Sequence, residues 1–444
     1  MSLQFITGNS GNGKTKYLFN RIVKEAKANP RDNYLVIVPE QFTMQTQRQL
    51  VDLSENKVIM NIDVLSFKRL AYRVFDELGI TNLTVLEETG KNLVLRKLAA
   101  QEADKLGVIG RNLNRIGYIS EVKSLLSELV QYNISPEELG RYIASGRLSD
   151  TLSDKLKDVL VLYEAFEKFM QDKYITAEEI LNVLSNVAEE SAILRNSVIA
   201  FDEFTGFTPI QNQLIKKLFV ISKKIYVTLT IDCREDIFKS RGMQELFDMP
   251  KRTVKSLTEM AAFYGIEVEE PIILDKNYRL AENEELSFME QQLFRKRRCS
   301  FKKAPKHIHI DCLRDPKQEL TKIARRINEL VRNENLRYRD IAIVTGDVNI
   351  YAGYVREIFD KYNIPYFIDA TQEILFHPFI EFIRSIPDIA AQNFSADAVF
   401  RFLRCGFSEL LDSEIDVLEN YVLACGVRGK NAWDKKWVRL PKHK

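Results

Sequence analysis

The feature that most constrains the fold of this chain is the stretch Gly8-Asn9-Ser10-Gly11-Asn12-Gly13-Lys14-Thr15, in which a glycine and four free positions precede Gly-Lys-Thr. An apolar run comes just before it and apolar residues at helical spacing follow it, which predicts a strand, a phosphate-binding loop and a helix. In such a loop, backbone N–H groups and the helix N-terminus surround the phosphates of ATP. Lys14 is expected to reach the β- and γ-phosphates, and the Thr15 hydroxyl to bind Mg²⁺. The alternative is a glycine-rich turn that only joins a strand to a helix.

A pair of carboxylates gives a second nucleotide-binding signal. The apolar run at residues 197–201 predicts a buried strand, and Asp202-Glu203 follows it directly. Beside a phosphate loop, the first carboxylate holds the Mg²⁺ shell and the second polarises the attacking water. We therefore predict Asp202 as a metal ligand and Glu203 as a catalytic residue. Taken alone, such a pair is more often a solvated strand end.

Composition excludes several classes of protein. Of the 444 residues, 45% are hydrophobic, enough for roughly two to four globular domains. No apolar run is long enough to cross a membrane and the N-terminus enters a predicted strand at once, so we expect no membrane span, no signal peptide and a cytoplasmic location. The net charge of +2 is too small to identify nucleic acid as a partner. The cysteines form no C-x-x-C pair, which predicts reduced core thiols and no zinc or iron–sulfur site in this stretch; they are Cys233, Cys299, Cys312, Cys405 and Cys425.

The remaining patterns predict an α/β protein interrupted by helices. Further core strands are expected at residues 34–38, 58–65 and 225–231, and their continuous apolar character indicates a parallel sheet. Between residues 79 and 195 only helical spacing occurs, near 87–103, 113–134, 136–145, 150–172 and 176–188. This indicates a helical insertion that leaves the sheet at one edge and returns at another.

A second α/β unit without a phosphate loop is expected in the last third of the chain. Its predicted strands are 307–312, 340–344 and 365–368, with helices at about 316–331 and 349–362, and helical spacing returns over roughly 376–430. A basic run precedes it and is either a solvated loop or a contact to a nucleic-acid backbone. That run consists of Arg295, Lys296, Arg297, Arg298, Lys302, Lys303 and Lys306.

Three of these stretches resemble motifs of superfamily 1 helicases of the UvrD/Rep/RecB type. GNSGNGKT is similar to motif I, DEFTGFTPIQ (202–211) to motif II and LDKNYR (274–279) to the motif IV element. The resemblance implies two RecA-like P-loop NTPase-type parallel-sheet domains with helical insertions. It also implies catalytic roles for Glu203, Gln211 and Arg279, with Arg279 approaching the γ-phosphate from the second domain. The alternative for Arg279 is a structural ion pair at the domain junction.

A closer resemblance is to the B subunit of the AddAB (RexAB) helicase–nuclease. It is carried by VPEQFTMQ from Val38, DVLSFKRLAYRV from Asp63, FDEFTGFTPIQ from Phe201, RYRDIAIV from Arg337 and YNIPYFID from Tyr362. It implies an ATP- and DNA-binding protein that works with an AddA-type helicase–nuclease subunit on double-strand DNA ends in recombinational repair, and scans single-stranded DNA for a hotspot. Family members are longer, and their C-terminal nuclease domain with its iron–sulfur cluster has no counterpart here, so we interpret the chain as an N-terminal portion.

The same resemblance gives the expected domains. Residues 1–78 and 196–270 would form the first RecA-like domain, and 79–195 its helical insertion. Residues 271–375 would form an incomplete second RecA-like domain, and 376–444 the start of a second helical insertion.

Side chains after the first strands predict where a DNA strand binds. We expect a cluster at the carboxyl edge of the sheet that stacks bases on aromatic rings and hydrogen-bonds their edges. Its predicted members are Gln41, Thr43, Phe67, Arg69, Tyr72 and Phe207. The alternative is that Phe67 and Tyr72 face the core and that Gln41 caps a helix.

One departure bears on activity. Working helicases carry a glutamine in motif III, whereas the corresponding stretch here, residues 227–235, has none. The resemblance therefore favours a protein that binds ATP–Mg²⁺ and DNA without driving movement. An autonomous ATP-driven superfamily 1 helicase is the alternative, and a small-molecule phosphate-loop kinase is disfavoured by the NYR element and the second α/β unit.

Overall fold

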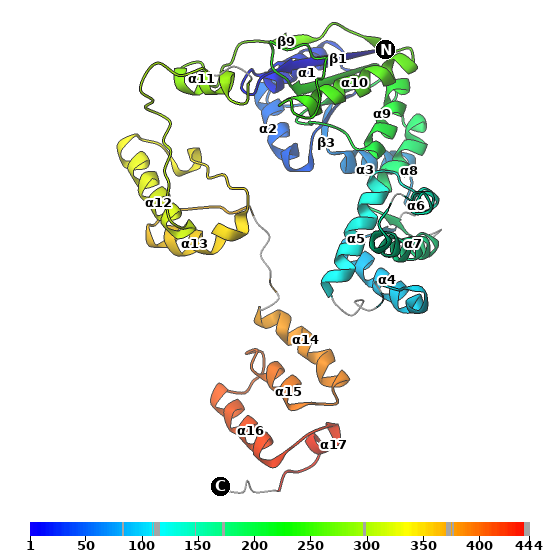
Figure 1. The fold of residues 1–444 in the computed structure, drawn as a ribbon, viewed down its shortest axis with the longest axis vertical. Helices are drawn as coiled ribbons and strands as arrows, with labels where there is room; N and C mark the ends of the chain where they lie inside the picture. Colours follow the sequence, from blue (N-terminus) through cyan, green and yellow to red (C-terminus); the bar gives the residue numbers. More distant parts are fainter. Residues whose placement is uncertain are drawn as a thin grey trace. The chain divides into compact units, whose positions relative to one another are not determined.

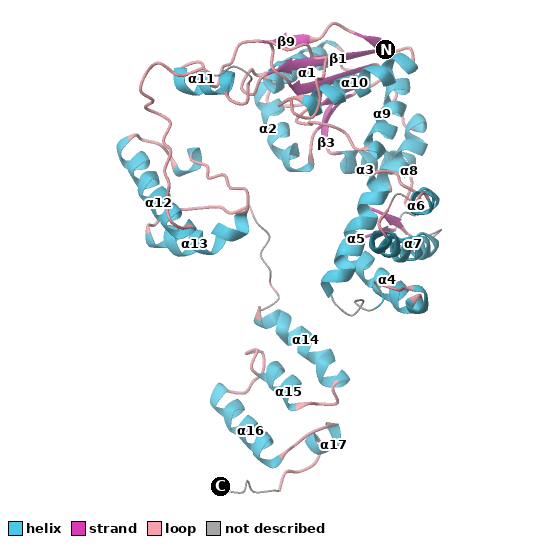
Figure 2. Ribbon diagram, viewed as in Figure 1, coloured by secondary structure: helices cyan, strands magenta, loops and turns pink. Residues whose placement is uncertain are grey.

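The computed structural model describes residues 1–81, 84–108, 110, 116–146, 148–170, 174–295, 299–369, 374 and 377–438. The chain forms two compact units, Met1–His309 and Ile310–Lys444 (Figure 1). A parallel sheet organises the first unit, and in Figure 2 its strands lie together as magenta arrows. This confirms the α/β fold class.

The sheet follows the order β3-β2-β6-β7-β1-β8, and β9 also pairs with β1. Every one of these pairings is parallel, so the carboxyl ends of neighbouring strands lie at the same edge. The strands are β1 (Ser2–Gly8), β2 (Tyr34–Ile37), β3 (Ile62–Leu65), β6 (Val198–Phe201), β7 (Lys224–Thr230), β8 (Glu267–Val268) and β9 (Ile272–Leu274). The predicted strand at 58–65 is thus shorter, and the sheet extends past residue 270.

Alternate strand residues face opposite sides of the sheet, and helices cover both. On one side, residues such as Phe5 and Ile199 pack beneath four helices; on the other, Ile6 and Ala200 pack beneath two. The first set is α3 (Phe67–Leu78), α8 (Ile180–Val187), α9 (Pro209–Ile221) and α10 (Asp248–Phe263), and the second is α1 (Lys14–Ala28) and α2 (Thr43–Leu53). Burial on both sides explains the continuous apolar runs of these strands.

Helices form in the stretch where the helical insertion is expected, and four of them share a core of their own. Leu95, Leu126, Leu139 and Leu162 belong to one buried cluster. The helices are α4 (Glu88–Gln101), α5 (Ile116–Gln131), α6 (Pro136–Ala144), α7 (Asp150–Met170) and the sheet-covering α8. Two short strands, β4 (Val85–Leu86) and β5 (Ile175–Thr176), were not predicted and pair in parallel.

The route of the insertion differs from the prediction in one respect. The chain leaves the sheet after β3, which is an edge strand, but it returns as β6 between β2 and β7. Return at a second edge was therefore wrong. The central position of β6 is what places Asp202 two strands from the phosphate loop that follows β1.

The second unit contains the predicted helices but not the predicted strands. Within its described residues, 310–312, 340–344 and 365–368 form no sheet pairing. Apolar side chains on these segments are consequently exposed: Ile310 is 94%, Val344 93% and Phe367 88% exposed. An apolar run forms a strand only when a neighbouring strand hydrogen-bonds to its backbone N–H and C=O groups. The hydrophobic periodicity of a segment does not show whether such a neighbouring strand exists.

Two helical groups make up this unit. Leu320 and Ile327 of α12 (Pro316–Asn333) pack against Phe359 of α13 (Val348–Lys361). Phe400 and Ile415 anchor a second small core. Its helices are α14 (Pro378–Ala391), α15 (Ala396–Leu403), α16 (Asp412–Cys425) and α17 (Lys430–Trp433). In the part of the chain that is described, no helix is long and apolar enough to span a membrane.

The cysteines do not occupy the core as predicted. Cys299 and Cys312 are exposed, and Cys233, Cys405 and Cys425 are half-buried. The spacing of the cysteines along the sequence predicted no metal site, but spacing carries no information about how deeply each thiol is buried.

Candidate nucleotide site and adjoining groove

The loop between β1 and α1 has the backbone that phosphate binding requires. Gly11 and Gly13 adopt positive φ angles of 91° and 78°, which favour glycine. A Cβ at Gly11 would lie 2.7 Å from Asn277 Oδ1. Lys14, the first residue of α1, donates from Nζ to the backbone oxygen of Asn9 at 3.0 Å. Burial lowers the pKa of Lys14, as does Arg279, while Asp202 and Glu203 raise it.

The carboxylates that follow β6 meet the start of α1. Thr15 Oγ1 lies 3.3 Å from Asp202 Oδ1 and 3.4 Å from Glu203 Oε1. Thr228 on β7 also donates to Asp202 Oδ1, but the buried Oδ2 has no hydrogen-bond partner among the described residues. Burial raises the pKa of Asp202, and the charge of Glu203 adds to it. A divalent cation would supply the missing partner of Oδ2 and offset the cost of the buried charge, so Thr15 and Asp202 fit an Mg²⁺ site.

Glu203 has a backbone that L-residues rarely adopt. Its φ is 64°, in the left-handed region, which costs of order 1–3 kcal/mol for a residue with a side chain. The side chain is exposed toward the cavity that holds Lys14. With this backbone conformation at the end of a buried strand, the carboxylate of Glu203 lies near Thr15, at the start of the helix that follows the phosphate loop.

The segment after β9 covers the phosphate loop. Tyr278 N donates to Gly11 O at 3.0 Å, and Asn277 Nδ2 to Ser10 O at 2.9 Å. Arg279 Nη1 lies 3.4 Å from Ser10 Oγ, and Arg279 shares a cavity of about 770 Å³ with Lys14. Arg279 thus shares a cavity with Lys14, but it lies on a segment that follows a strand of the first sheet, not on the separate second domain from which it was predicted to approach.

A separate groove of about 730 Å³ lies where β2 and β3 end. Three of the predicted DNA-contacting residues line it: Phe67, Arg69 and Tyr72. Arg69 Nε pairs with Glu40 Oε1 at 2.9 Å, and Ser66 also donates to Glu40. Sequence reasoning missed Glu40 and Phe204, both of which line the groove. Glu40 lies within the stretch VPEQF that was compared with the family, and its negative charge next to a predicted strand end could have indicated an ion pair.

The other predicted DNA-contacting residues do not line this groove. Gln41 is exposed on the 3₁₀ turn Glu40–Phe42. Thr43 is buried and donates to Glu40 O at 3.0 Å. Phe207 packs against Phe67 and Phe201. Phe67 itself is only 7% exposed, so little of its ring is available to stack on a base.

Gln211 is brought to this groove and not to the nucleotide cavity. Its Oε1 accepts from Thr208 N at 2.9 Å, and its backbone N–H donates to Thr208 Oγ1 at 3.4 Å. This reciprocal pair is a capping box at the start of α9. A catalytic role for Gln211 stays a prediction.

Comparison with known proteins decides the family. Residues 5–290 match the family described as "ADDB, N-terminal". The chain belongs to this AddB family. Relatives named as the B subunit of an "ATP-dependent helicase/deoxyribonuclease" include that of Lachnoclostridium phytofermentans, 39% identical over 99% of this chain and 39% of the relative. Those of Clostridium acetobutylicum and Clostridioides difficile are each 34% identical, over 99% and 98% of this chain and 38% of the relative. The chain therefore spans about two fifths of the length of these relatives.

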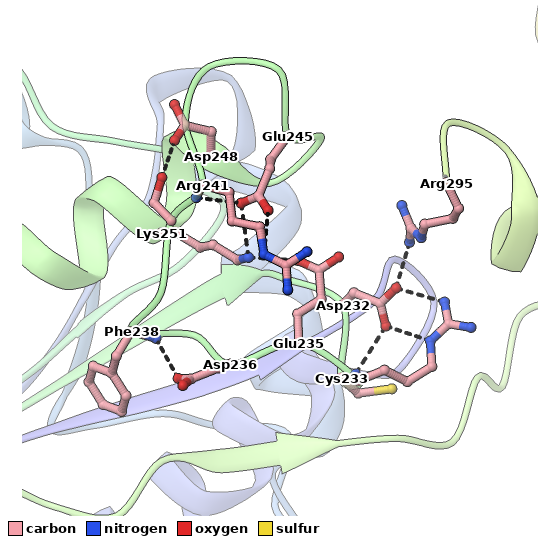
Figure 3. Close-up of polar contacts among 12 residues, drawn as sticks. Asp232, Cys233, Glu235, Asp236, Phe238, Arg241, Glu245, Asp248, Lys251 and Arg295 are labelled. Carbon is pink, nitrogen blue, oxygen red and sulfur yellow. Dashed lines mark hydrogen bonds and ion pairs between the residues drawn. The ribbon is translucent and has the colours of Figure 1, made fainter. Parts of the chain in front are cut away.

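In this AddB-family chain, the loop after β7, which was compared above with helicase motif III, contains a network of ion pairs (Figure 3). Asp232, 2% exposed, follows β7 and accepts from Arg234 Nη2 at 2.6 Å and Arg295 Nη2 at 2.7 Å. Cys233 N donates to Asn9 Oδ1 at 2.9 Å, which ties this loop to the phosphate loop. Lys251 pairs with Glu235 at 2.7 Å. Of the basic run, Arg295 is thus a structural partner of Asp232, and Lys296, Arg297 and Arg298 lie outside the described residues.

We expect Asp232→Asn to destabilise the AddB-family chain in a pH-dependent manner. Burial alone would raise the pKa of Asp232, but the bonds and charges of Arg234, with the charge of Arg295, lower it to about 2. This stabilisation is complete above the unfolded pKa of about 4 and is lost as pH falls toward 2. Because Arg234 is half exposed, the loss at pH 7 should be at most about 2 kcal/mol of unfolding free energy.

Urea denaturation followed by far-ultraviolet circular dichroism at pH 7 and pH 3 measures this effect. The difference between wild type and variant should shrink at pH 3. Glu259→Gln, at an exposed position on α10, controls for loss of a carboxylate. An equal difference at both pH values would contradict the assignment.

Proposed function

We propose that this chain is the ATP- and DNA-binding part of the B subunit of an AddAB-type helicase–nuclease, which processes double-strand DNA ends for recombinational repair. It would work in the cytoplasm with an AddA-type subunit. One observation carries the proposal: Phe204 lines both the nucleotide cavity and the groove around Arg69. A single sheet edge can therefore present a nucleotide and a DNA strand to the same element.

At the nucleotide cavity, Lys14 would bind the β- and γ-phosphates, and Thr15 and Asp202 would hold Mg²⁺. The metal would neutralise phosphate charge, and Glu203 would orient the attacking water. Arg279, within hydrogen-bonding distance of Ser10, is suited to stabilise charge that develops on the γ-phosphate. The iron–sulfur cluster that the family resemblance implies would be held by residues other than those described here.

In the groove, Arg69 and Tyr72 would contact a single strand that is scanned for a hotspot sequence. Arg69 is half exposed although it pairs with Glu40, so a base edge can compete for its guanidinium. Tyr72, 39% exposed, can stack a base, which contributes about 1–3 kcal/mol. We also propose that residues 1–78 and 196–270, extended by β9 (Ile272–Leu274), form a first RecA-like domain. The residues that follow, to 375, would belong to a second RecA-like domain, and 79–195 and 376–444 to the two helical insertions.

We expect Arg69→Ala in the complete two-subunit complex to abolish the hotspot response while ATP binding and the unwinding rate survive. Arg73→Ala is the matched control, because Arg73 lies one turn further along α3 and pairs with Asp63 at 3.8 Å, away from the groove lining. Unwinding and cleavage of DNA with and without the hotspot measure the effect. If the hotspot response, ATP binding and the unwinding rate all fell together, Arg69 would have a purely structural role.

An autonomous helicase is the second candidate, favoured by the presence of both Asp202 and Glu203. The network around Asp232 argues against it, since it fixes the loop that would couple the γ-phosphate to DNA movement. A DNA-stimulated ATPase assay on the full-length AddB-type protein, purified without its partner, separates the two. Strong stimulation by single-stranded DNA would favour the autonomous motor.

A further inference from the structure

The helical insertion carries a groove of its own, of about 610 Å³, which no role described above uses. It is formed where α6, α7, β5 and the start of α8 come together. Its floor is apolar and aromatic, with Tyr163, Phe166 and Met170 of α7 and Ile175 of β5. Tyr174, 36% exposed, stands at its edge.

Four carboxylates surround this floor: Glu137, Glu164, Glu167 and Glu179. Among the described residues, none of the four forms an ion pair. Glu179 accepts from Thr176 N at 2.6 Å. Burial raises the pKa of Glu167, and repulsion from Glu137, Glu179 and Glu164 raises it further. Among the described residues that line the groove, Lys168 is the one cation, so four carboxylates face a single ammonium and the groove remains net negative.

The charge and the floor together define what can bind. A phosphate backbone would be repelled, so the groove is unsuited to DNA. In the described part of the chain, no three Asp, Glu, His or Cys side chains are arranged to hold a metal ion. The aliphatic stem of a lysine or arginine suits the apolar floor, and its charged head suits the rim and the faces of tyrosine rings.

We propose that this groove is a docking site for a lysine- and arginine-bearing segment of the partner subunit. Charge complementarity selects this occupant, and the proposal rests on the two-subunit function proposed above. The helical insertion would then contribute to assembly, while the sheet edge serves nucleotide and DNA.

Zero-length cross-linking of the assembled full-length complex tests the proposal directly. A carbodiimide adds to a carboxylate and forms an activated ester. A lysine amine then attacks the carbonyl carbon and forms an amide, and the carbodiimide leaves as a urea that carries away one carboxylate oxygen. Mass spectrometry should find Glu164 or Glu167 linked to lysines of the partner subunit. Links to added spermidine in place of partner lysines would assign the groove to a free polyamine and overturn the proposal.

Charge reversal provides the second arm. Glu164→Lys with Glu167→Lys should weaken subunit association on the order of a hundredfold, with a reduced dependence on salt. Both positions are exposed, and far-ultraviolet circular dichroism reports whether the helices of the insertion are still folded. Asp104→Lys with Glu121→Lys makes the same charge change at exposed positions of the insertion outside the groove. Equal weakening by both pairs, or by neither, overturns the docking site.

The docking site and the two-subunit function fail in different ways. Wild-type subunits that do not associate would refute the two-subunit function. Subunits that associate normally despite both groove substitutions would refute the docking site alone.

Discussion

Lys14→Ala should weaken ATP binding by about 3 kcal/mol, on the order of a hundredfold in Kd. The Lys14 ammonium lies in the same cavity as Asp202, Glu203 and Arg279, and in the loop it donates to the backbone oxygen of Asn9. Each charge-assisted bond to a phosphate contributes about 1.5–3 kcal/mol, and alanine supplies none. Titration calorimetry with ATP and Mg²⁺ measures the loss.

The control for this variant is Lys24→Ala, an exposed lysine further along α1. It removes the same charge from the same helix without touching the loop. Equal ATP affinity of Lys14→Ala and wild type would remove the phosphate loop from the binding site.

Glu203→Gln should leave ATP affinity nearly unchanged and lower any turnover by about 10²–10⁴-fold, the usual effect of losing a general base. The amide keeps the shape of the side chain and its place 3.4 Å from Thr15, but it cannot accept a proton from water. Phosphate release under single-turnover conditions measures the effect. Glu282→Gln, at an exposed neighbouring carboxylate outside the cavity, should turn over normally.

A wild-type rate already at the level of Glu203→Gln would mean that the site binds ATP without hydrolysing it. A Glu203→Gln variant with full turnover would instead show that another group orients the water. These two outcomes distinguish a nucleotide-holding protein from a slow ATPase.

Local chemistry explains what the sequence could predict. The loop at Gly8–Thr15 and the end of β6 are short stretches whose residue types are dictated by phosphate and metal, so their structure follows from reading them. The parallel sheet followed from continuous apolar runs such as 34–37. The helices of the insertion followed from spacing, because each has a buried face.

Pairing between distant residues explains what the sequence could not predict. The contact of Arg69 with Glu40 joins residues on different elements, and the charges of the two residues do not by themselves identify each as the partner of the other. The segments at 340–344 and 365–368 look like strands, yet strand formation depends on a partner. Thr208 and Gln211 have the spacing of a capping box. They also lie in the stretch that resembles a helicase motif, and that resemblance predicted a catalytic role for Gln211 instead.

The shared position of Phe204 has a thermodynamic consequence. One ring borders both cavities, so if nucleotide displaced that ring, it would reshape the surface proposed to bind a DNA strand. Reciprocity then requires that whatever factor ATP applies to the affinity for DNA, DNA applies to the affinity for ATP. The coupling follows from four dissociation constants: those of ATP with and without DNA, and those of DNA with and without ATP. Measuring all four in wild type and in Phe204→Leu would give the coupling free energy that this one side chain contributes.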